Sequence, residues 1–226
     1  MVIAYSKRLT MLPNLIIPVL NRYDLLQRML DTVDMKIAHL VIIDNGNSMT
    51  EMRFPEGAQN VHVIPLPANL GVAGSWNLGV KSLPHHDRWF IASNDIMLAP
   101  NDLARLANAN RDEVTLTAAA PFWQLFALGE EVVRKVGLFD ESFHPAYFED
   151  NDYERRVQHF GFGIRKLELG VQHDNSSTLR SSAKFSAMNN ETFRANRNYF
   201  ENKQSRGDVS PGFWSLTRRR RNDWLR

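Results

Sequence analysis

The turn at residues 69–77, Asn-Leu-Gly-Val-Ala-Gly-Ser-Trp-Asn, carries the first signs of chemistry, because Gly71 and Gly74 stand at the start of a predicted helix. Glycine lets the backbone approach a phosphate closely, and the N-terminus of a helix favours anions. The spacing is neither a dinucleotide fingerprint nor a P-loop, because the third glycine of the first and the Gly-Lys-Ser/Thr of the second are missing. The turn therefore predicts a phosphate-binding loop or, alternatively, a tight strand-to-helix connection.

An isolated acid, Asp95, comes shortly after the apolar run at residues 89–92. A carboxylate at the end of a buried strand is costly unless a cation meets it. Mg²⁺ or Mn²⁺ bridging a diphosphate takes one or two carboxylates together with phosphate oxygens. Asp95 is thus a candidate metal ligand, with a turn-capping aspartate as the alternative.

A second acidic group, Glu149 and Asp150, opens a predicted helix within an aromatic segment. Acids at a helix start could serve only as caps or compensate the helix dipole. The aromatic surroundings favour a site, because partly desolvated carboxylates are better bases. His173 follows a predicted strand and could join a carboxylate on a manganese-type ion, although a lone histidine more often serves packing.

The elements that must position these residues are predicted to form a parallel sheet covered by helices. Short apolar runs alternate with apolar residues at helical spacing in the first half of the chain, and the connections are short. The expected strands are residues 12–20, 39–43, 60–65 and 88–92, and the expected helices are 23–32, 73–83 and one that begins at 100. In such sheets ligands bind beyond the carboxyl ends of the strands, where Asp44 and Asp95 stand.

The second half is less regular. An apolar, aromatic stretch at 115–127 predicts a strand that runs into a pocket wall, residues 150–159 predict a helix, and residues 164–171 predict a late strand. We expect a domain at 1–180, made of a first part at about 12–110 and a second part at about 111–180. A helical or irregular extension at 181–226 would follow and end in a basic tail.

Composition narrows the class of protein. The chain has 226 residues, of which 43% are hydrophobic and 23% are charged, and this suits a folded domain with an ample core. The lack of cysteine excludes disulfides, a thiolate nucleophile and a cysteine-based zinc site. No stretch approaches the length of a transmembrane segment, and the N-terminus has the wrong charge order for a secretory signal, so we expect a cytoplasmic protein.

Charge is concentrated at the C-terminus. Five arginines against Asp223 give the last nine residues a net charge of +4 within a chain of net charge +2. The body is therefore not a polycation, which argues against a nucleic-acid sleeve. The run from Arg218 to Arg221 could contact an anionic surface (lipid, nucleic acid or an acidic partner) or form a solvated tail.

From about residue 15 to residue 178 these segments resemble family-2 glycosyltransferases of the GT-A fold, in particular rhamnosyltransferase-like members. The family's motifs occur in its order, with a fainter match at 198–203. The matching residues are Pro18, Asn21 and Arg22 after the first strand; Asp44 after the second; Asn69, Gly71, Gly74, Asn77 and Gly79; Asn94 and Asp95; Gly137, Phe139, Asp140, Glu141, Phe143, Glu149, Asp150 and Asp152; and His173 and Ser177.

The resemblance implies inverting transfer of a sugar from a UDP- or dTDP-sugar. The residues that it implies for nucleotide-sugar binding are Pro18, Leu20, Arg22, Asp44, Asn69, Gly71, Gly74, Asn77 and Asn94. Among them Asp44 would hold the base. Asp95 and His173 would bind Mn²⁺ or Mg²⁺ on the diphosphate, which neutralises charge on the leaving group.

On the acceptor side, the resemblance implies that Asp150 is the general base for an acceptor hydroxyl. Glu149 and Trp123 would shape the acceptor site, and the base role stays open between Glu149, Asp150 and Asp152. The acceptor itself, whether glycan, protein, lipid-linked sugar or nucleic acid, is not indicated.

Two departures from the family pattern bear on these expectations. Asn94 stands where many members carry another acid, and the Trp-Gly-Gly that often follows the lysine in relatives is missing after Lys203. The alternatives are a nucleic-acid-directed glycosyltransferase, a nucleotidyltransferase, or a non-catalytic domain that binds nucleotide sugars.

Overall fold

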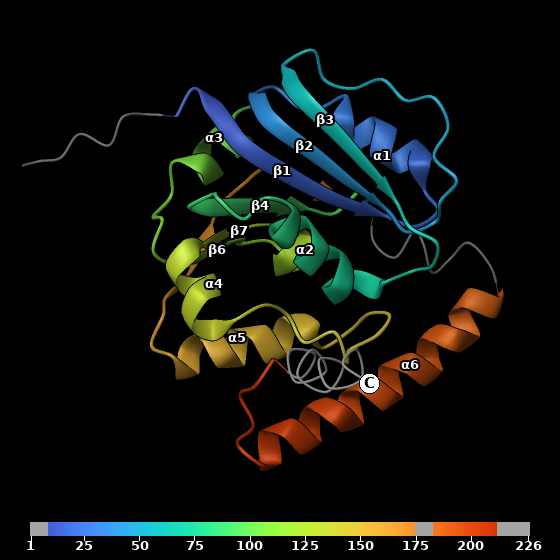
Figure 1. Ribbon diagram of the computed structural model, residues 1–226, viewed down its shortest axis with the longest axis vertical. Helices are drawn as coiled ribbons and strands as arrows, with labels where there is room; N and C mark the ends of the chain where they lie inside the picture. Colours follow the sequence, from blue (N-terminus) through green and yellow to red (C-terminus); the bar gives the residue numbers. More distant parts are fainter. Residues whose placement is uncertain (1–8, 175–182, 212–226) are drawn as a thin grey trace, which may run out of the picture.

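The computed structural model describes residues 9–174 and 183–211, and its centre is a seven-stranded sheet in the order β3-β2-β1-β4-β7-β6-β8 (Figure 1). Neighbouring strands pair in parallel, except that β7 runs antiparallel to both β4 and β6. The strands are β1 (Met11–Val19), β2 (Lys36–Asp44), β3 (Ala58–Pro65), β4 (Arg88–Ala92), β6 (Val114–Thr117), β7 (Leu125–Gly129) and β8 (Ile164–Leu167).

A second, two-stranded sheet pairs β5 (Ile96–Met97) with β9 (Gln172–His173) in antiparallel register. The helices are α1 (Tyr23–Leu30), α2 (Gly71–Ser82), α3 (Asp102–Ala107), α4 (Glu130–Val136), α5 (Glu149–His159) and α6 (Ala183–Ser205), with a short 3₁₀ helix at Phe122–Gln124. None of the helices in the described ranges is both long and apolar enough to cross a bilayer.

The helices cover both faces of the large sheet, which explains why its central strands are apolar throughout. One core cluster joins α1 and α3 to the sheet, and the other joins α2, α4 and α5 to the opposite face. All five residues of β4 are buried between these layers. The prediction of a mostly parallel sheet covered by helices is confirmed.

The predicted strand at 115–127 is wrong, because two antiparallel strands, β6 and β7, occupy this stretch. The connection between them contains Pro121, which cannot donate to a ladder of hydrogen bonds. The side chain of Thr117 instead donates to the carbonyl of Ala119 or Phe122, each at 3.1 Å. The late strand predicted at 164–171 is also too long, because β8 ends at Leu167 and the chain then leads into β9.

Helix α4 lacks the long apolar periodicity that identifies a helix. Its signals are local: two acids in the first turn, Arg134 and Lys135 in the last, and Gly137 after it with φ = 84°. Helix α6 has a weak periodic face at Phe193, Asn196, Phe200 and Lys203 within a largely polar sequence. In Figure 1 it runs along the lower edge of the molecule, at the end of the sheet away from β1–β3.

Candidate functional site

Asp44 ends β2 and lies almost fully buried at the carboxyl edge of the sheet. Its Oδ1 accepts hydrogen bonds from the Tyr23 hydroxyl at 2.6 Å and the backbone N–H of Gly46 at 3.2 Å. Its Oδ2 accepts one from the N–H of Met49 at 3.2 Å. Burial and the bond to Asp44 raise the pKa of Tyr23 to about 12, so the phenol stays a donor at neutral pH.

The turn at 69–71 is fixed by a hydrogen bond to Asn45, which follows β2, and by the close approach of the loop at Pro145. The Oδ1 of Asn69 accepts the N–H of Gly71 at 2.8 Å, and the Oδ1 of Asn45 accepts the N–H of Leu70 at 2.9 Å. Gly71 has φ = 74°, and a Cβ there would lie 2.6 Å from the carbonyl oxygen of Pro145. The glycine is thus required both by its backbone conformation and by the close approach of the 145 loop.

The turn meets the loop that leads to the acidic segment. The N–H of Val72 donates to the carbonyl of Pro145 at 2.7 Å, and His144 Nε2 lies 3.0 Å from the carbonyl oxygen of Asn69. The fold therefore brings the two-glycine turn next to the segment that contains Glu149.

Asn77 lies inside the molecule, where it joins α2 to the segment at 139–141. Its amide donates to the carbonyl of Phe139 at 2.9 Å and to Oε1 of Glu141 at 2.8 Å, and its Oδ1 accepts the N–H of Phe139 at 2.9 Å. Asn77 therefore positions the segment at 139–141 against α2. Contact between its side chain and a nucleotide stays a prediction, and so does the contact expected for Gly74, which packs against Leu70.

Asp95 and His173, distant in sequence, are brought together by the pairing of β5 with β9. His173 Nε2 lies 3.2 Å from Asp95 Oδ1, and both side chains are largely buried. Two ligands at right angles on one Mg²⁺- or Mn²⁺-sized ion are about 3 Å apart, so the pair fits such an ion geometrically. Within the described residues no cluster of three or more His, Asp or Glu side chains is arranged for a metal, so phosphate oxygens and water would complete the shell.

The remaining donor-side residues lie around this pair. The Asn94 amide donates to the carbonyl of Arg22 at 3.2 Å, which ties the end of β4 to the end of β1. The Arg22 guanidinium forms two hydrogen bonds with Asp24 at 2.8 and 2.7 Å. Pro18 pairs in register with Ile43, and Leu20 follows directly after β1, so both stand at the carboxyl edge.

Glu149 and Asp150 differ in their surroundings. Glu149 is 6% exposed, and no described residue gives its Oε2 a hydrogen bond. Burial, followed by the neighbouring charge of Asp150, raises the pKa of Glu149 to about 8. Asp150 is partly exposed and accepts the N–H of Asn151 at 2.8 Å, and burial raises its pKa as well.

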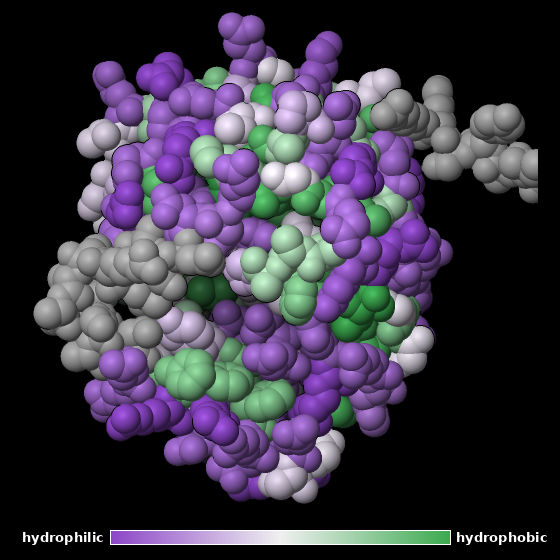
Figure 2. Space-filling view, turned by 180° about the vertical axis from the view of Figure 1, so that it is seen from behind, coloured by the Kyte–Doolittle hydropathy of each residue, from purple (hydrophilic) through white to green (hydrophobic). Residues whose placement is uncertain are grey.

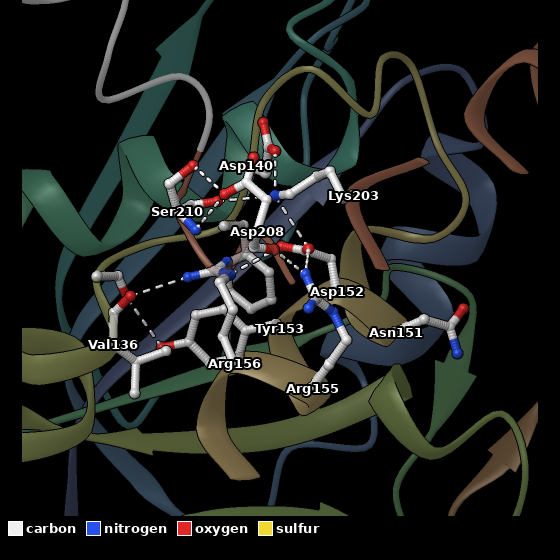
Figure 3. Close-up of polar contacts among 12 residues, drawn as sticks. Val136, Asp140, Asn151, Asp152, Tyr153, Arg155, Arg156, Lys203, Asp208 and Ser210 are labelled. Carbon is white, nitrogen blue, oxygen red and sulfur yellow. Dashed lines mark hydrogen bonds and ion pairs between the residues drawn. The ribbon is translucent and has the colours of Figure 1, made fainter. Parts of the chain in front are cut away.

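Asp152, the third acid of this segment, is committed to an ionic network (Figure 3). Lys203 of α6 lies 3.0 Å from Asp152 Oδ1 and 2.7 Å from Asp140 Oδ2, and all three side chains are buried. Burial opposes ionisation of Asp140, but the Lys203 ammonium holds its pKa below the usual range. Arg156 completes the network with a hydrogen bond to Asp152 Oδ2 at 2.8 Å.

The same network fixes α6 against the site. Tyr199 donates from its hydroxyl to Asp140 at 3.0 Å, and the Asn196 amide donates to the carbonyl of Ala146 at 2.7 Å. Of these contact residues, Tyr199 and Lys203 fall in the family match at 198–203. Asn196 lies outside it and could have been found only from the one-face spacing of α6.

Trp123, the predicted acceptor residue, lies in the aromatic part of the core. Its ring is 6% exposed and contacts Trp76, Phe126 and Tyr153, and its Nε1 donates to Glu154 at 2.8 Å. An acceptor role for Trp123 stays a prediction. Ser177 and the arginine run from Arg218 to Arg221 lie outside the described residues.

We compared the sequence and the structure of this chain with those of known proteins. No protein-family model matches the chain. A galactofuranosyl glycosyltransferase of Leishmania donovani is 32% identical over a segment that covers 32% of this chain and 21% of the relative. The match thus spans about a fifth of that relative's length.

Solved structures give longer matches at lower identity. GalNAc-T7 with UDP, GalNAc and Mn²⁺ is 13% identical, with a TM-score of 0.57 over 74% of this chain and 44% of that chain. A Drosophila β1,4-galactosyltransferase 7 mutant with manganese, UDP-Gal and xylobiose is 11% identical, with a TM-score of 0.53 over 76% and 74%. These neighbours are GT-A glycosyltransferases, and the predicted GT-A fold is confirmed.

Proposed function

We propose that this chain is a metal-dependent, inverting glycosyltransferase that moves a sugar from a UDP- or dTDP-sugar to an acceptor hydroxyl. The observation that carries the proposal is the 3.2 Å pair of Asp95 and His173, on the same edge of a GT-A sheet as Asp44 and the two-glycine turn. The likeness to a galactofuranosyl glycosyltransferase and to glycosyltransferase structures that contain UDP or UDP-Gal and manganese supports the donor class.

In the donor half, the carboxyl edge of the sheet holds the nucleotide. Asp44 accepts an N–H from the base, and its existing hydrogen bonds fix the carboxylate for that contact. Pro18, Leu20 and Arg22 line the same edge, and the 69–74 turn and Asn94 border the phosphates. Asp95 and His173 hold Mn²⁺ or Mg²⁺, which when bound stabilises the negative charge on the departing diphosphate.

In the acceptor half, Asp150 takes the proton of the acceptor hydroxyl. The oxygen forms a bond to the anomeric carbon of the donor sugar while the bond from that carbon to the diphosphate oxygen breaks, and the nucleoside diphosphate leaves. One in-line displacement inverts the anomeric centre. Glu149, protonated below pH 8, offers a hydrogen-bond donor beside the base.

Glu149 is the second candidate for the base, because its Oε2 is buried and has no hydrogen-bond partner among the described residues. The two assignments differ in their pH dependence. With Glu149 as the base, activity rises as pH passes through about 8, where this carboxyl loses its proton. With Asp150 as the base, the acid limb of the pH profile is kept in the Glu149→Gln variant.

A thermal-shift titration with UDP, dTDP and their sugars, with and without Mn²⁺, tests the donor half. We expect stabilisation by one of the two nucleotide classes that depends on Mn²⁺ and is lost in Asp95→Ala. Asp150→Asn should keep this stabilisation and abolish release of the nucleoside diphosphate. Stabilisation of Asp95→Ala equal to that of the unmodified chain would sink the metal assignment, and unchanged turnover by Asp150→Asn would remove Asp150 from the base role.

A further inference from the structure

The loop before the candidate base and the exposed face of α6 together form an aromatic shelf, defined as Tyr147, Phe148, Phe193 and Phe200. The ring centroid of Phe193 lies 5.3 Å from that of Tyr147 and 5.1 Å from that of Phe148. Phe148 stacks on Phe200 at 5.6 Å. Phe193 is 40% exposed and the other three are partly exposed, so the rings contact one another and still present apolar surface to solvent.

The backbone of this shelf is strained. Tyr147 and Phe148 have φ values of 81° and 71°, a conformation in which bulky side chains are rarely found. The surrounding structure must maintain it, and Asn196 does so by donating from its amide to the carbonyls of Ala146 and Tyr147, at 2.7 and 3.3 Å. Strained backbone of this kind is found most often at ligand sites.

In the sequence, the shelf residues Tyr147 and Phe148 directly precede the acids Glu149 and Asp150. Phe148 is the N-terminal cap of α5, and Glu149 and Asp150 are the first two residues of that helix. The shelf residue Phe148 is therefore the direct sequence neighbour of the pair of carboxylates that would receive a hydroxyl proton. Figure 2 shows hydrophobic side chains gathered in the lower part of the molecule, where α6 lies, with hydrophilic residues around them.

We propose that the aromatic shelf binds the acceptor, and that the acceptor is a carbohydrate whose ring stacks on Phe193. This inference rests on the proposed function and names its acceptor class. The C–H face of a sugar ring carries partial positive charge and packs on the negative face of an aromatic ring. The hydroxyls at the rim of the same sugar hydrogen-bond to carboxylates such as Asp150.

Charge and shape favour a sugar over other occupants. Nucleic acid would place phosphates beside Asp150, whose ionised carboxylate repels a like charge. A lipid chain needs an enclosed apolar channel, whereas the shelf residues are partly exposed and Figure 2 shows hydrophilic residues around the hydrophobic ones in this part of the molecule. A neutral carbohydrate meets neither obstacle.

The test is binding of the full chain, loaded with UDP and Mn²⁺, to a printed array of neutral oligosaccharides. We expect retention on a subset of glycans, a loss of about tenfold or more in apparent affinity for Phe193→Ala, and recovery in Phe193→Trp. The matched control is Phe160→Ala, since Phe160 is a similarly exposed phenylalanine (44%) at the other end of α5. Its binding should equal that of the unmodified chain.

The stabilisation of each variant by UDP and Mn²⁺ is measured in parallel, which separates this inference from the proposed function. Intact nucleotide binding with no glycan retained, or equal retention by Phe193→Ala, overturns the shelf as an acceptor site. Retention of single-stranded DNA or of phosphatidylcholine vesicles in place of glycans overturns it as well. Glycan retention that depends on Phe193 in a chain without nucleotide binding supports the shelf and refutes the transferase.

Discussion

Replacing Glu149 by glutamine is expected to remove a large pH dependence from the stability of this protein. The carboxyl is buried, and its pKa rises from an ordinary 4.5 to about 8 on folding, chiefly through burial and secondarily through the charge of Asp150. Between these two values the native state holds a proton that the unfolded chain has released. The free energy of unfolding therefore falls as pH rises from about 4.5 to about 8, and levels off above.

The size of the effect follows from the two pKa values. Each pKa unit of difference corresponds to about 1.4 kcal/mol, so a change from 4.5 to about 8 amounts to about 5 kcal/mol. Glutamine has nearly the shape of the protonated acid and does not ionise. Glu149→Gln should nearly match the unmodified chain near pH 5, exceed its stability increasingly up to about pH 8, and keep that difference at pH 9.

Urea unfolding at pH 5, 6, 7, 8 and 9 gives the difference in free energy between the two proteins at each pH. Glu51→Gln is the control, because Glu51 is exposed and lies in a loop. A difference for Glu149→Gln that stays flat from pH 5 to pH 9, as it should for Glu51→Gln, would show that Glu149 is not a buried, protonated acid. The base assignment that depends on its raised pKa would then fail with it.

Two further substitutions test the contacts that position the acidic segment. Lys203→Met should lower the free energy of unfolding by about 3–5 kcal/mol, because it leaves Asp140 and Asp152 buried without their ammonium; a loss below 1 kcal/mol in urea unfolding would contradict the buried network. Asn77→Ala should cost about 2–4 kcal/mol, because the backbone N–H and C=O of Phe139 lose their buried partner. An unfolding midpoint equal to that of the unmodified chain would show that this link between α2 and residues 139–141 contributes nothing.

The fold was predictable because its central strands are apolar on both faces. The runs that became β1, β2 and β4 lie between two helical layers, so nearly every residue must be apolar and the pattern is unambiguous. The division between β6 and β7 was not predictable from periodicity. Strand β7 is apolar throughout, the two threonines of β6 are buried like its Val114 and Leu116, and only Pro121 and the alanines before it mark the connection.

The sequence could not locate the helix within the helical or irregular extension expected at 181–226, because contacts outside the helix stabilise it. Helix α6 has a polar sequence, and its attachment depends on three polar side chains, Asn196, Tyr199 and Lys203, that bond to residues 140–152. Such contacts between distant segments leave no periodic apolar signal. The extension expected after residue 180 thus includes a helix that holds the candidate site in place.

Within the site, candidate residues could be identified from the sequence, but their proximity to one another and their burial could not. Asp95 and His173 share no local pattern, and only the pairing of β5 with β9 brings them to 3.2 Å. Likewise, burial separates Glu149 from Asp150, although the two are neighbours in the sequence. Environment rather than residue type sets these differences.

Five acidic residues lie at positions 140–152, and three of them are paired with lysine or amide groups. Asp140 and Asp152 share Lys203, and Glu141 accepts from Asn77 and lies 3.9 Å from Lys81. These three carboxylates have partners that favour their charged form.

Glu149 and Asp150 are the remaining pair, and no cation among the described residues forms a salt bridge with either. Burial raises the pKa of both. A carboxylate whose charge is stabilised by a lysine is a poor base, because its pKa is lowered, whereas an unpaired, partly desolvated one takes a proton readily near neutral pH. The network of Lys203 anchors α5 through Asp152, and in the proposed reaction it would leave proton transfer to the two acids at the helix start.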